Sequence, residues 1–427
     1  MTRSPSITPS SARICCCAFV LFFSLARLTQ AQSASWPQWG GPQRNFVVDA
    51  KGLAESWPAT GPRRLWSREL GEGHSSIIVD GDRLYTMYSK GEQEFVVAID
   101  RATGRTIWEK GYAAPTTGLN LRVESLSVKG PHSTPLVAGD LLITVGVIGK
   151  LQAFEKQTGN LVWSHDLWRE YAGTRTERGY TCSPLVYKNT VIAIVGGAGQ
   201  SLMAFDLKTG AVVWKKQSFR LSFSTPTLIN VDGQDQVAMA FADDVVGIDP
   251  NTGELLWRHP HPCGGFHITP PVWGGAGGDN ILFISSAYDC GSCALQLQQS
   301  SGKTTVKQLW ASSRMRVHHG TIIRLGDLVF GSSGTFGPAP LTAMNVKTGQ
   351  VVWQDRAFPK SNFVYADGKL ILLDEDGQLA LIRLSPQGMR VVSKATVLEH
   401  IAWTPPTLAG TNLYLRDCKM LVALDLR

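Results

Sequence analysis

The chain has 427 residues, of which 43% are hydrophobic and 18% are charged, with 43 glycines, 22 prolines and 13 tryptophans. This composition excludes a disordered chain and predicts a globular, turn-rich protein with ample material for a core. The formal net charge is +7. Because the basic residues are spread along the chain, we expect no nucleic-acid groove and no nucleic acid as a partner.

Residues 1–31 have the pattern of a secretory signal peptide. Arg3 and Arg13 precede an apolar run from Ile14 to Ala26, and small residues follow, so cleavage is expected after Ala31. The run is short for a bilayer span, with an uncleaved anchor as the alternative. No later stretch is long and apolar enough for a membrane helix. We therefore expect an exported protein, periplasmic or extracellular, without a transmembrane span after cleavage.

Residues 32–62 form a lead-in segment that is rich in Trp, Pro and Gly and contains the string WPQWGGPQRN at 36–45. We expect this segment to be ordered and to pack over one face of the domain that follows. That domain is expected to occupy residues 63–427.

One string recurs through residues 63–427: an apolar run leads to Asp or Asn, then to Thr-Gly, and Trp follows after three more residues. Its turn glycines, from Gly104 to Gly388, lie 39 to 55 residues apart, which is the period of four-stranded propeller blades. Five close copies and two weaker ones end, in chain order, at Trp108, Trp163, Trp214, Trp257, Trp310, Trp353 and Val392. The repeat predicts an all-β propeller.

The string predicts a tight hairpin between the two outer strands of each blade. Alternating apolar residues form the first strand, the Asp accepts hydrogen bonds from turn amides, and the Gly supplies the positive φ that the turn needs. The Trp at the end of the second strand suits the packing layer between neighbouring blades.

The two ends of the domain are expected to complete one blade together. An eighth, incomplete unit runs from Thr404 to the terminal string ALDLR and lacks its outer strand, whereas RRLWSREL, with Trp66, has the outer-strand pattern without preceding inner strands. Pairing the N- and C-terminal strands removes the open edge of the ring. We predict eight four-stranded antiparallel blades, with seven as the alternative if the Trp-less unit near Gly388 is not a blade.

These units resemble the repeats of pyrroloquinoline-quinone (PQQ) dependent dehydrogenases and of the propeller scaffolds that assist outer-membrane protein assembly. The chain is also similar to exported bacterial PQQ-like propellers that open with the motif W-P-x-W-x-G-P. That motif is formed here by Trp36, Pro37, Trp39, Gly41 and Pro42. The resemblance spans residues 36–427 and implies the propeller fold, with PQQ as the cofactor to consider.

Two departures weigh against an enzyme. The quinoprotein alcohol dehydrogenases that the chain resembles are longer and carry a vicinal disulfide over the cofactor, whereas the mature chain has no adjacent cysteines. No catalytic Asp or calcium ligand set can be carried over. We therefore expect a non-catalytic binding or scaffold module that acts through its channel mouth and holds a protein, a glycan or a small anionic ligand. A PQQ-dependent alcohol oxidoreductase is the alternative.

Each blade has one position just before its innermost strand, and these eight positions should surround the channel mouth. Four of them are histidine: His74, His132, His267 and His319. This collar could bind a ligand, or its imidazoles could only satisfy loop backbone groups. By blade order the histidines form two pairs on opposite sides of the channel. We therefore expect no single metal site. The other four positions are Thr181, Phe223, Ser361 and Ala402.

The same loops carry arginines that could complement an anionic ligand, with ordinary solvated loop charge as the alternative. The candidates are Arg178, Arg220 and Arg316, with Arg122, Arg175 and Arg314 nearby.

Five cysteines remain after residue 31, an odd number, so at least one is not paired within the chain. The spacing of Cys290 and Cys293 favours a local structural disulfide, with unpaired thiols or a redox pair as alternatives. A metal at this spacing would need two more ligands, and the nearest candidates, Cys263 and His267, lie in the preceding loop.

Overall fold

The computed structural model describes residues 1–2, 35–123, 126–127, 129–274, 278–288, 290–335 and 337–427. The predicted signal peptide lies outside these residues except for its first two, so it stays a prediction. Ser33–Arg427 form one compact unit. Within the described ranges every regular element is a β-strand, and no helix has the length and apolarity to cross a membrane.

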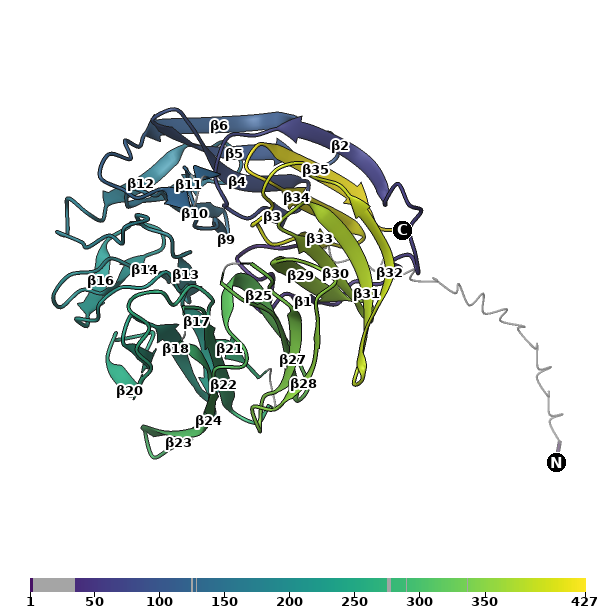
Figure 1. The fold of residues 1–427 in the computed structure, drawn as a ribbon. Helices are drawn as coiled ribbons and strands as arrows, with labels where there is room; N and C mark the ends of the chain where they lie inside the picture. The colour runs from purple at the N-terminus through teal and green to yellow at the C-terminus, as the bar shows by residue number, and fades with distance from the viewer. Residues whose placement is uncertain (3–34, 124–125, 128, 275–277, 289, 336) are drawn as a thin grey trace. The chain divides into compact units, whose positions relative to one another are not determined.

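Eight four-stranded antiparallel blades form a ring, as predicted (Figure 1). Blade 1 consists of β3 (Ile78–Asp80), β4 (Arg83–Lys90), β5 (Gln93–Asp100) and β6 (Thr106–Ala113). Blade 2 consists of β9 (Leu136–Ala138), β10 (Leu141–Val145), β11 (Lys150–Glu155) and β12 (Leu161–Asp166). Blade 3 consists of β13 (Leu185–Tyr187), β14 (Thr190–Ile194), β15 (Leu202–Asp206) and β16 (Val212–Lys216). Blade 4 consists of β17 (Thr227–Val231), β18 (Gln234–Ala240), β19 (Asp244–Ile248) and β20 (Leu255–Pro260).

The second half repeats this plan. Blade 5 consists of β21 (Val272–Trp273), β22 (Ile281–Ser286), β23 (Gly291–Ser300) and β24 (Lys303–Ser312). Blade 6 consists of β25 (Val317–Leu325), β26 (Leu328–Ser333), β27 (Leu341–Asn345) and β28 (Val351–Asp355). Blade 7 consists of β29 (Ser361–Ala366), β30 (Lys369–Asp374), β31 (Gln378–Ser385) and β32 (Gly388–Thr396). Blade 8 consists of β33 (Thr407–Ala409), β34 (Asn412–Arg416), β35 (Met420–Asp425) and β2 (Arg63–Glu69). A two-stranded hairpin, β7 (Arg122–Val123) with β8 (Leu126–Ser127), lies between blades 1 and 2 in the sequence.

The ring closes through the predicted pair of terminal strands. The N-terminal strand β2 pairs antiparallel with the C-terminal strand β35, with Trp66 opposite Ala423. The Trp-less unit around Gly388 forms the complete blade 7, so the seven-bladed alternative is wrong. Closure leaves no unpaired blade edge at the seam.

The repeat string joins each blade to its neighbour. In blade 1, Asp100 accepts a hydrogen bond of 2.8 Å from the backbone N–H of Thr103, and Gly104 has a φ of +75°. A Cβ atom on Gly104 would lie 2.8 Å from the ring of Trp66 in blade 8. The same contact recurs in other blades, at 2.5 to 2.8 Å between Gly159 and Trp108, Gly210 and Trp163, Gly253 and Trp214, and Gly349 and Trp310. The Gly is therefore required both by its turn and by the preceding blade's Trp.

Most of these tryptophans also donate a hydrogen bond to the next blade. The indole N–H of Trp108 donates to the carbonyl of Lys156, and that of Trp163 donates to the carbonyl of Leu207, both at 3.0 Å. Trp257 departs from this plan and donates to Gln236 of its own blade at 2.6 Å. The Asp-to-Trp string thus forms the hairpin of its own blade and also supplies contacts that hold neighbouring blades together.

The segment before β2 lies among the innermost strands of the ring. Trp36 forms a bridge with Val79 of β3, and the carbonyl of Pro37 accepts a hydrogen bond of 2.8 Å from Val137 of β9. Strand β1 (Val47–Val48) then pairs parallel with β29, on the inner side of blade 7 (Figure 1). Residues 36–48 therefore cross the central channel from blades 1 and 2 to blade 7.

Candidate functional site

The loops that precede the innermost strands form one face of the ring, which we call the mouth face, and they enclose a cavity of about 330 Å³. We call it the mouth cavity. Its walls come from seven blades, all but blade 7, and from the channel-crossing segment, which supplies Trp39. The residues that line it are Trp39, His74, His132, Glu177, Arg178, Thr181, Ser183, Phe223, Thr225, Phe266, Ile268, Thr269, Pro270, Tyr288, His318, His319, Gly320, Trp403 and Pro405.

The structure brings together part of the predicted collar. His74, His132, His319 and Arg178 line the mouth cavity, as do the collar positions Thr181 and Phe223. His267, Arg220 and Arg316 do not line it. His267 is fully buried, with one ring nitrogen 2.5 Å from the Ser286 hydroxyl and the other 2.8 Å from the carbonyl of His261. For His267, therefore, the interpretation that the imidazole satisfies loop groups holds.

Ring contacts link the collar histidines of blades 1, 2 and 6. The rings of His74 and His132 stack with centroids 5.7 Å apart. His74 and His319, from blades 1 and 6, both contact the ring of Trp403, at 5.4 and 4.7 Å. Trp403, on the loop before β33, lies between the rings of His74 and His319 and so links blades 1 and 6.

These contacts extend into one continuous row of rings, which we call the ring arc. From His319 the row continues to His318 at 4.8 Å, to Tyr288 at 5.0 Å and to Phe266 at 4.7 Å. The Tyr288 hydroxyl also lies 2.7 Å from Nε2 of His318. In order, the ring arc is His132, His74, Trp403, His319, His318, Tyr288 and Phe266. The ring arc gives the mouth cavity a wall made of aromatic and imidazole rings.

The three cavity-lining collar imidazoles are neutral. Burial lowers the pKa of His132 to about 4 and lowers those of His74 and His319 well below their usual value. Among the described residues, both ring nitrogens of His74 and of His319, and Nε2 of His132, have no hydrogen-bonding partner. A neutral imidazole carries one donor and one acceptor. These buried nitrogens therefore leave hydrogen-bonding capacity unmet behind the cavity wall, without positive charge.

A second cavity of about 570 Å³, the side cavity, adjoins the first and shares Glu177, Phe223 and Phe266 with it. It lies between the mouth-face loops that lead into blades 3, 4 and 5. Arg220 lines it and forms an ion pair with Asp243 at 2.7 Å. Arg175 also lines it, and its guanidinium lies 3.9 Å from the ring centre of Trp168.

The cationic residues of this face have partners within the protein. Arg178 lies 3.3 Å from the Glu177 carboxylate and donates to the carbonyl of Asn120 at 2.7 Å. Arg220 is held by Asp243, and the pKa of that carboxyl is lowered chiefly by its hydrogen bond to Arg220. These pairs agree with ordinary loop charge at Arg178 and Arg220. Arg316 hydrogen-bonds through its backbone to blade 6 and lies outside both cavities.

The predicted disulfide between Cys290 and Cys293 is wrong: Cys290 pairs with Cys263, with Cα atoms 5.4 Å apart. Cys293 belongs to strand β23 and is fully buried in the core shared by blades 4 and 5, whereas Cys290 lies in the turn before that strand. The strand directs the Cys293 side chain away from the turn. The observed bridge joins the loops that carry Phe266 and Tyr288, so it braces one end of the ring arc.

Sequence reasoning missed four rings of the cavity wall: Trp39, Phe266, Tyr288 and Trp403. Trp403 directly follows a collar position, Ala402, and Phe266 directly precedes His267, so widening the collar by one residue would have found both. Within the described ranges no cluster of three His, Cys, Asp or Glu side chains could hold a metal ion.

The sequence matches, over residues 30–110 and 92–355, the model of a family described as outer membrane protein assembly factor BamB. The chain belongs to this family. A BamB from Burkholderia pseudomallei is 25% identical over 246 residues, which are 49% of this chain and 62% of that protein. The quinohemoprotein alcohol dehydrogenase ADH-IIG of Pseudomonas putida is 24% identical over 311 residues, which are 64% of this chain and 40% of the enzyme. The matches thus cover less than two thirds of either relative.

Solved structures agree on the propeller. BamB from Moraxella catarrhalis superposes with a TM-score of 0.60 and 20% identity, over 84% of this chain and 97% of that one. Quinohemoprotein alcohol dehydrogenase from Comamonas testosteroni superposes with a TM-score of 0.67 and 13% identity, over 94% and 82%. At these identities the likeness shows the fold alone. The BamB family therefore places this chain among PQQ-type propellers without assigning a ligand.

Proposed function

We propose that this protein is an exported, non-catalytic binding module that holds a partner protein on its mouth face. The observation that carries the proposal is the joined pair of cavities there, with a common wall of Phe223 and Phe266. Together they form a recess that runs from the channel axis outward across blades 3 to 5. Such recesses with buried aromatic anchors are typical of protein-binding sites.

A protein partner suits the charges of the recess better than a free anion does. Arg178 and Arg220 are already paired with Glu177 and Asp243, so a small anion would have to displace a carboxylate. A partner's backbone and apolar side chains would instead meet neutral imidazoles and aromatic faces. The relatives described as outer membrane protein assembly factors support a scaffold role of this kind.

The disulfide supports export. Bridges such as that between Cys263 and Cys290 persist in oxidising compartments and are rare in the cytosol. This agrees with the signal peptide that residues 1–31 predict and favours the periplasm or the outside of the cell.

The second candidate is a PQQ-dependent alcohol oxidoreductase, favoured by the stacked rings of the mouth cavity and by the dehydrogenase relatives. The residues do not fit a calcium-bound, carboxylate-rich quinone. Among the described lining residues Glu177 is the one carboxylate, and it is engaged by Arg178. The collar imidazoles add no positive charge because they are neutral. We assign no reaction step to this cavity.

Site-specific photo-crosslinking in producing cells tests the proposal. A crosslinking residue at Thr174, which is exposed and lines the side cavity, should give one discrete protein adduct. The same residue at Val213, which is 51% exposed on outer strand β16 of blade 3, should not give it. Phe266→Ala should reduce the Thr174 adduct about tenfold, because truncation of an aromatic anchor typically costs more than 1 kcal/mol of binding energy.

Two outcomes would contradict the binding proposal. One is the same adduct from Thr174 and Val213. Both positions lie in or next to blade 3, but only Thr174 of the two lines the recess. The other is an adduct that Phe266→Ala leaves at full yield.

A further inference from the structure

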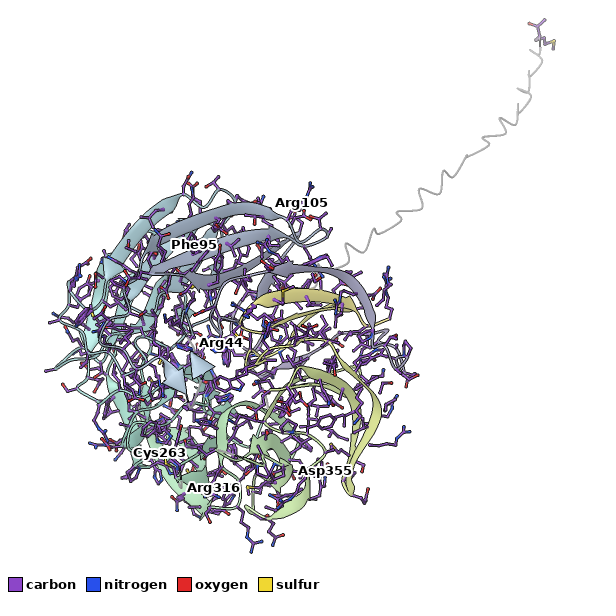
Figure 2. All side chains as sticks on the ribbon, turned by 45° about the horizontal axis from the view of Figure 1, so that its top comes forward. Arg44, Phe95, Arg105, Cys263, Arg316 and Asp355 are labelled. Atoms are coloured by element: carbon purple, nitrogen blue, oxygen red, sulfur yellow. A yellow bond between two sulfur atoms is a disulfide. The ribbon has the colours of Figure 1, made fainter. Side chains whose placement is uncertain are left out.

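The seam between blades 7 and 8 lacks both the Trp and the turn glycine of the repeat string. Blade 7 has Val392 where the other blades carry Trp. Blade 8 has no outer hairpin turn, because β35 and β2 come from opposite ends of the chain. Figure 2 shows Arg105, which lies on the corresponding turn of blade 1, at the outer edge of the ring. The Trp–Gly packing found at five other seams is therefore missing at this part of the outer edge.

A cavity of about 510 Å³, which we call the rim cavity, lies at this seam. The lead-in segment forms one wall of it and is held on blade 7. The backbone N–H of Trp57 donates to the Ser393 hydroxyl of β32 at 2.8 Å, and that hydroxyl donates to the Trp57 carbonyl at 3.2 Å. A Cβ atom on Gly61 would lie 3.0 Å from that of Ala395. The rim cavity shares no lining residue with the mouth cavity or the side cavity.

The charged side chains that line the rim cavity are three arginines, Arg63, Arg64 and Arg427, and none of its lining residues is acidic. Arg63 and Arg427 both donate to Oδ2 of Asp425, at 2.7 and 2.9 Å. Asp425 is 2% exposed and does not line the cavity. One carboxylate behind the wall therefore serves two guanidinium groups, whose side chains stay 66% and 65% exposed. Arg64 is exposed, and no carboxylate among the described residues engages it.

Positive charge is thus in surplus at the rim cavity. The three guanidinium groups outnumber the negative groups even when the α-carboxylate of Arg427 is counted with Asp425. The hydrogen bonds from Arg427 and then Arg63 lower the pKa of Asp425, so this carboxylate is ionised and already engaged at neutral pH. On the mouth face, by contrast, Arg178 and Arg220 each have a carboxylate of their own. The donors of the rim cavity are therefore available to an anion from outside the chain.

The rest of the wall is largely apolar. Trp57 and Pro62 come from the lead-in segment, Val397 follows β32, and Leu424 belongs to β35. Trp57 is 8% exposed, and its buried indole N–H has no acceptor among the described residues. A ligand that fits this cavity therefore combines an anionic end for the arginines with an apolar body for the remaining wall.

We propose that the rim cavity binds a phosphate monoester, with the phosphate held by Arg63, Arg64 and Arg427 and the apolar body packed on the Trp57 side. A phosphate monoester presents three terminal oxygens, which guanidinium forks can engage from several directions, whereas a carboxylate presents two. The surplus of positive charge is complementary to this group. The same chemistry occurs in soluble phosphate esters and in lipids that end in a phosphate, and the test separates these two sources.

Equilibrium dialysis of the purified protein with phenyl phosphate tests the site. The wild type should bind saturably, and Arg64→Gln should weaken binding about tenfold, because it removes a charge-assisted contact. Arg64→Gln should fold normally, since Arg64 is exposed and is engaged by no carboxylate. Arg390→Gln is the matched control, because Arg390 is exposed on β32 but does not line the cavity, and it should bind as the wild type does. Benzyl alcohol, which keeps the ring but lacks the phosphate, should not bind.

Flotation with phosphatidylcholine vesicles, with and without phosphatidic acid, identifies the source of the phosphate. Retention on the vesicles with phosphatidic acid that Arg64→Gln abolishes assigns the site to a lipid. Saturable binding of phenyl phosphate without such retention assigns it to a soluble ester. No saturable binding of phenyl phosphate by the wild type, or equal affinity in Arg64→Gln and the wild type, overturns the proposal.

Discussion

Replacing Arg416 with alanine is expected to lower the free energy of unfolding by about 4 kcal/mol. Arg416 ends strand β34 of blade 8 and is fully buried. Its guanidinium donates to the carbonyls of Ser75 at 3.0 Å and Met87 at 2.8 Å, both on the blade 1 side of the seam. The substitution removes these bonds, so the Met87 carbonyl loses its guanidinium donor and the Ser75 carbonyl keeps the Thr86 hydroxyl as a donor. The ring should therefore weaken where its two ends meet.

Urea unfolding measures this effect, and Arg390→Ala is the matched control. Arg390 is exposed on outer strand β32, so its loss should change the free energy of unfolding by less than about 0.5 kcal/mol. A loss below about 1 kcal/mol for Arg416→Ala would show that the seam depends on the pairing of β2 with β35 alone.

Acid should destabilise the protein as the pH falls from about 6.5 toward 4, because its buried imidazoles are neutral in the folded state. The unfolded chain binds a proton at each histidine near pH 6.5, whereas burial lowers the pKa of folded His132 to about 4. The unfolded state thus holds more protons in this window, which costs about 3 kcal/mol at His132 alone. The lowered pKa values of His74 and His319 act in the same direction.

Glu94 acts in the opposite direction. It is fully buried, bonded to the Tyr112 hydroxyl at 2.7 Å, and burial raises its pKa to about 7. Its contribution is present below about pH 4.5 and is lost as the pH rises through 7. Asp374, whose pKa burial raises to about 6, acts in the same direction as Glu94. These two carboxyls are outweighed by the imidazoles with lowered pKa values, six among the described residues, so the net effect of acid is a loss of stability.

His132→Gln isolates one of these groups. In urea unfolding between pH 6 and pH 4.5, the slope of stability against pH should fall by about 1.4 kcal/mol per unit, the value for one proton. Glu94→Gln should instead steepen the slope, because it removes the opposing group. An unchanged slope in His132→Gln would mean that this imidazole is protonated in the folded protein.

The ring architecture was predictable because each blade repeats the same local chemistry. Asp100, Gly104 and Trp108 lie within nine residues of one another. The hairpin and the Trp that packs between blades can therefore be recognised from one short sequence motif. The closure by Trp66 followed from counting strands. What the string did not reveal is that five of the seven turn glycines contact the Trp of the preceding blade, between residues 38 to 51 positions apart in the sequence.

The site was only partly predictable, since it depends on which loops meet at the axis. Aligning the repeats placed His74, His132 and His319 at the mouth. It could not show that Trp403 joins the rings of blades 1 and 6, nor that Cys290 turns toward Cys263 rather than Cys293.

We propose that this PQQ-type propeller is a binding module and not a cofactor enzyme, and retention of the cofactor distinguishes the two. The purified protein is equilibrated with PQQ and calcium, passed through gel filtration and examined for PQQ absorbance, beside the double variant His132→Ala, His319→Ala. We predict that neither protein retains the quinone. Stoichiometric retention by the wild type that the double variant abolishes would contradict the claim and place the cofactor in the mouth cavity.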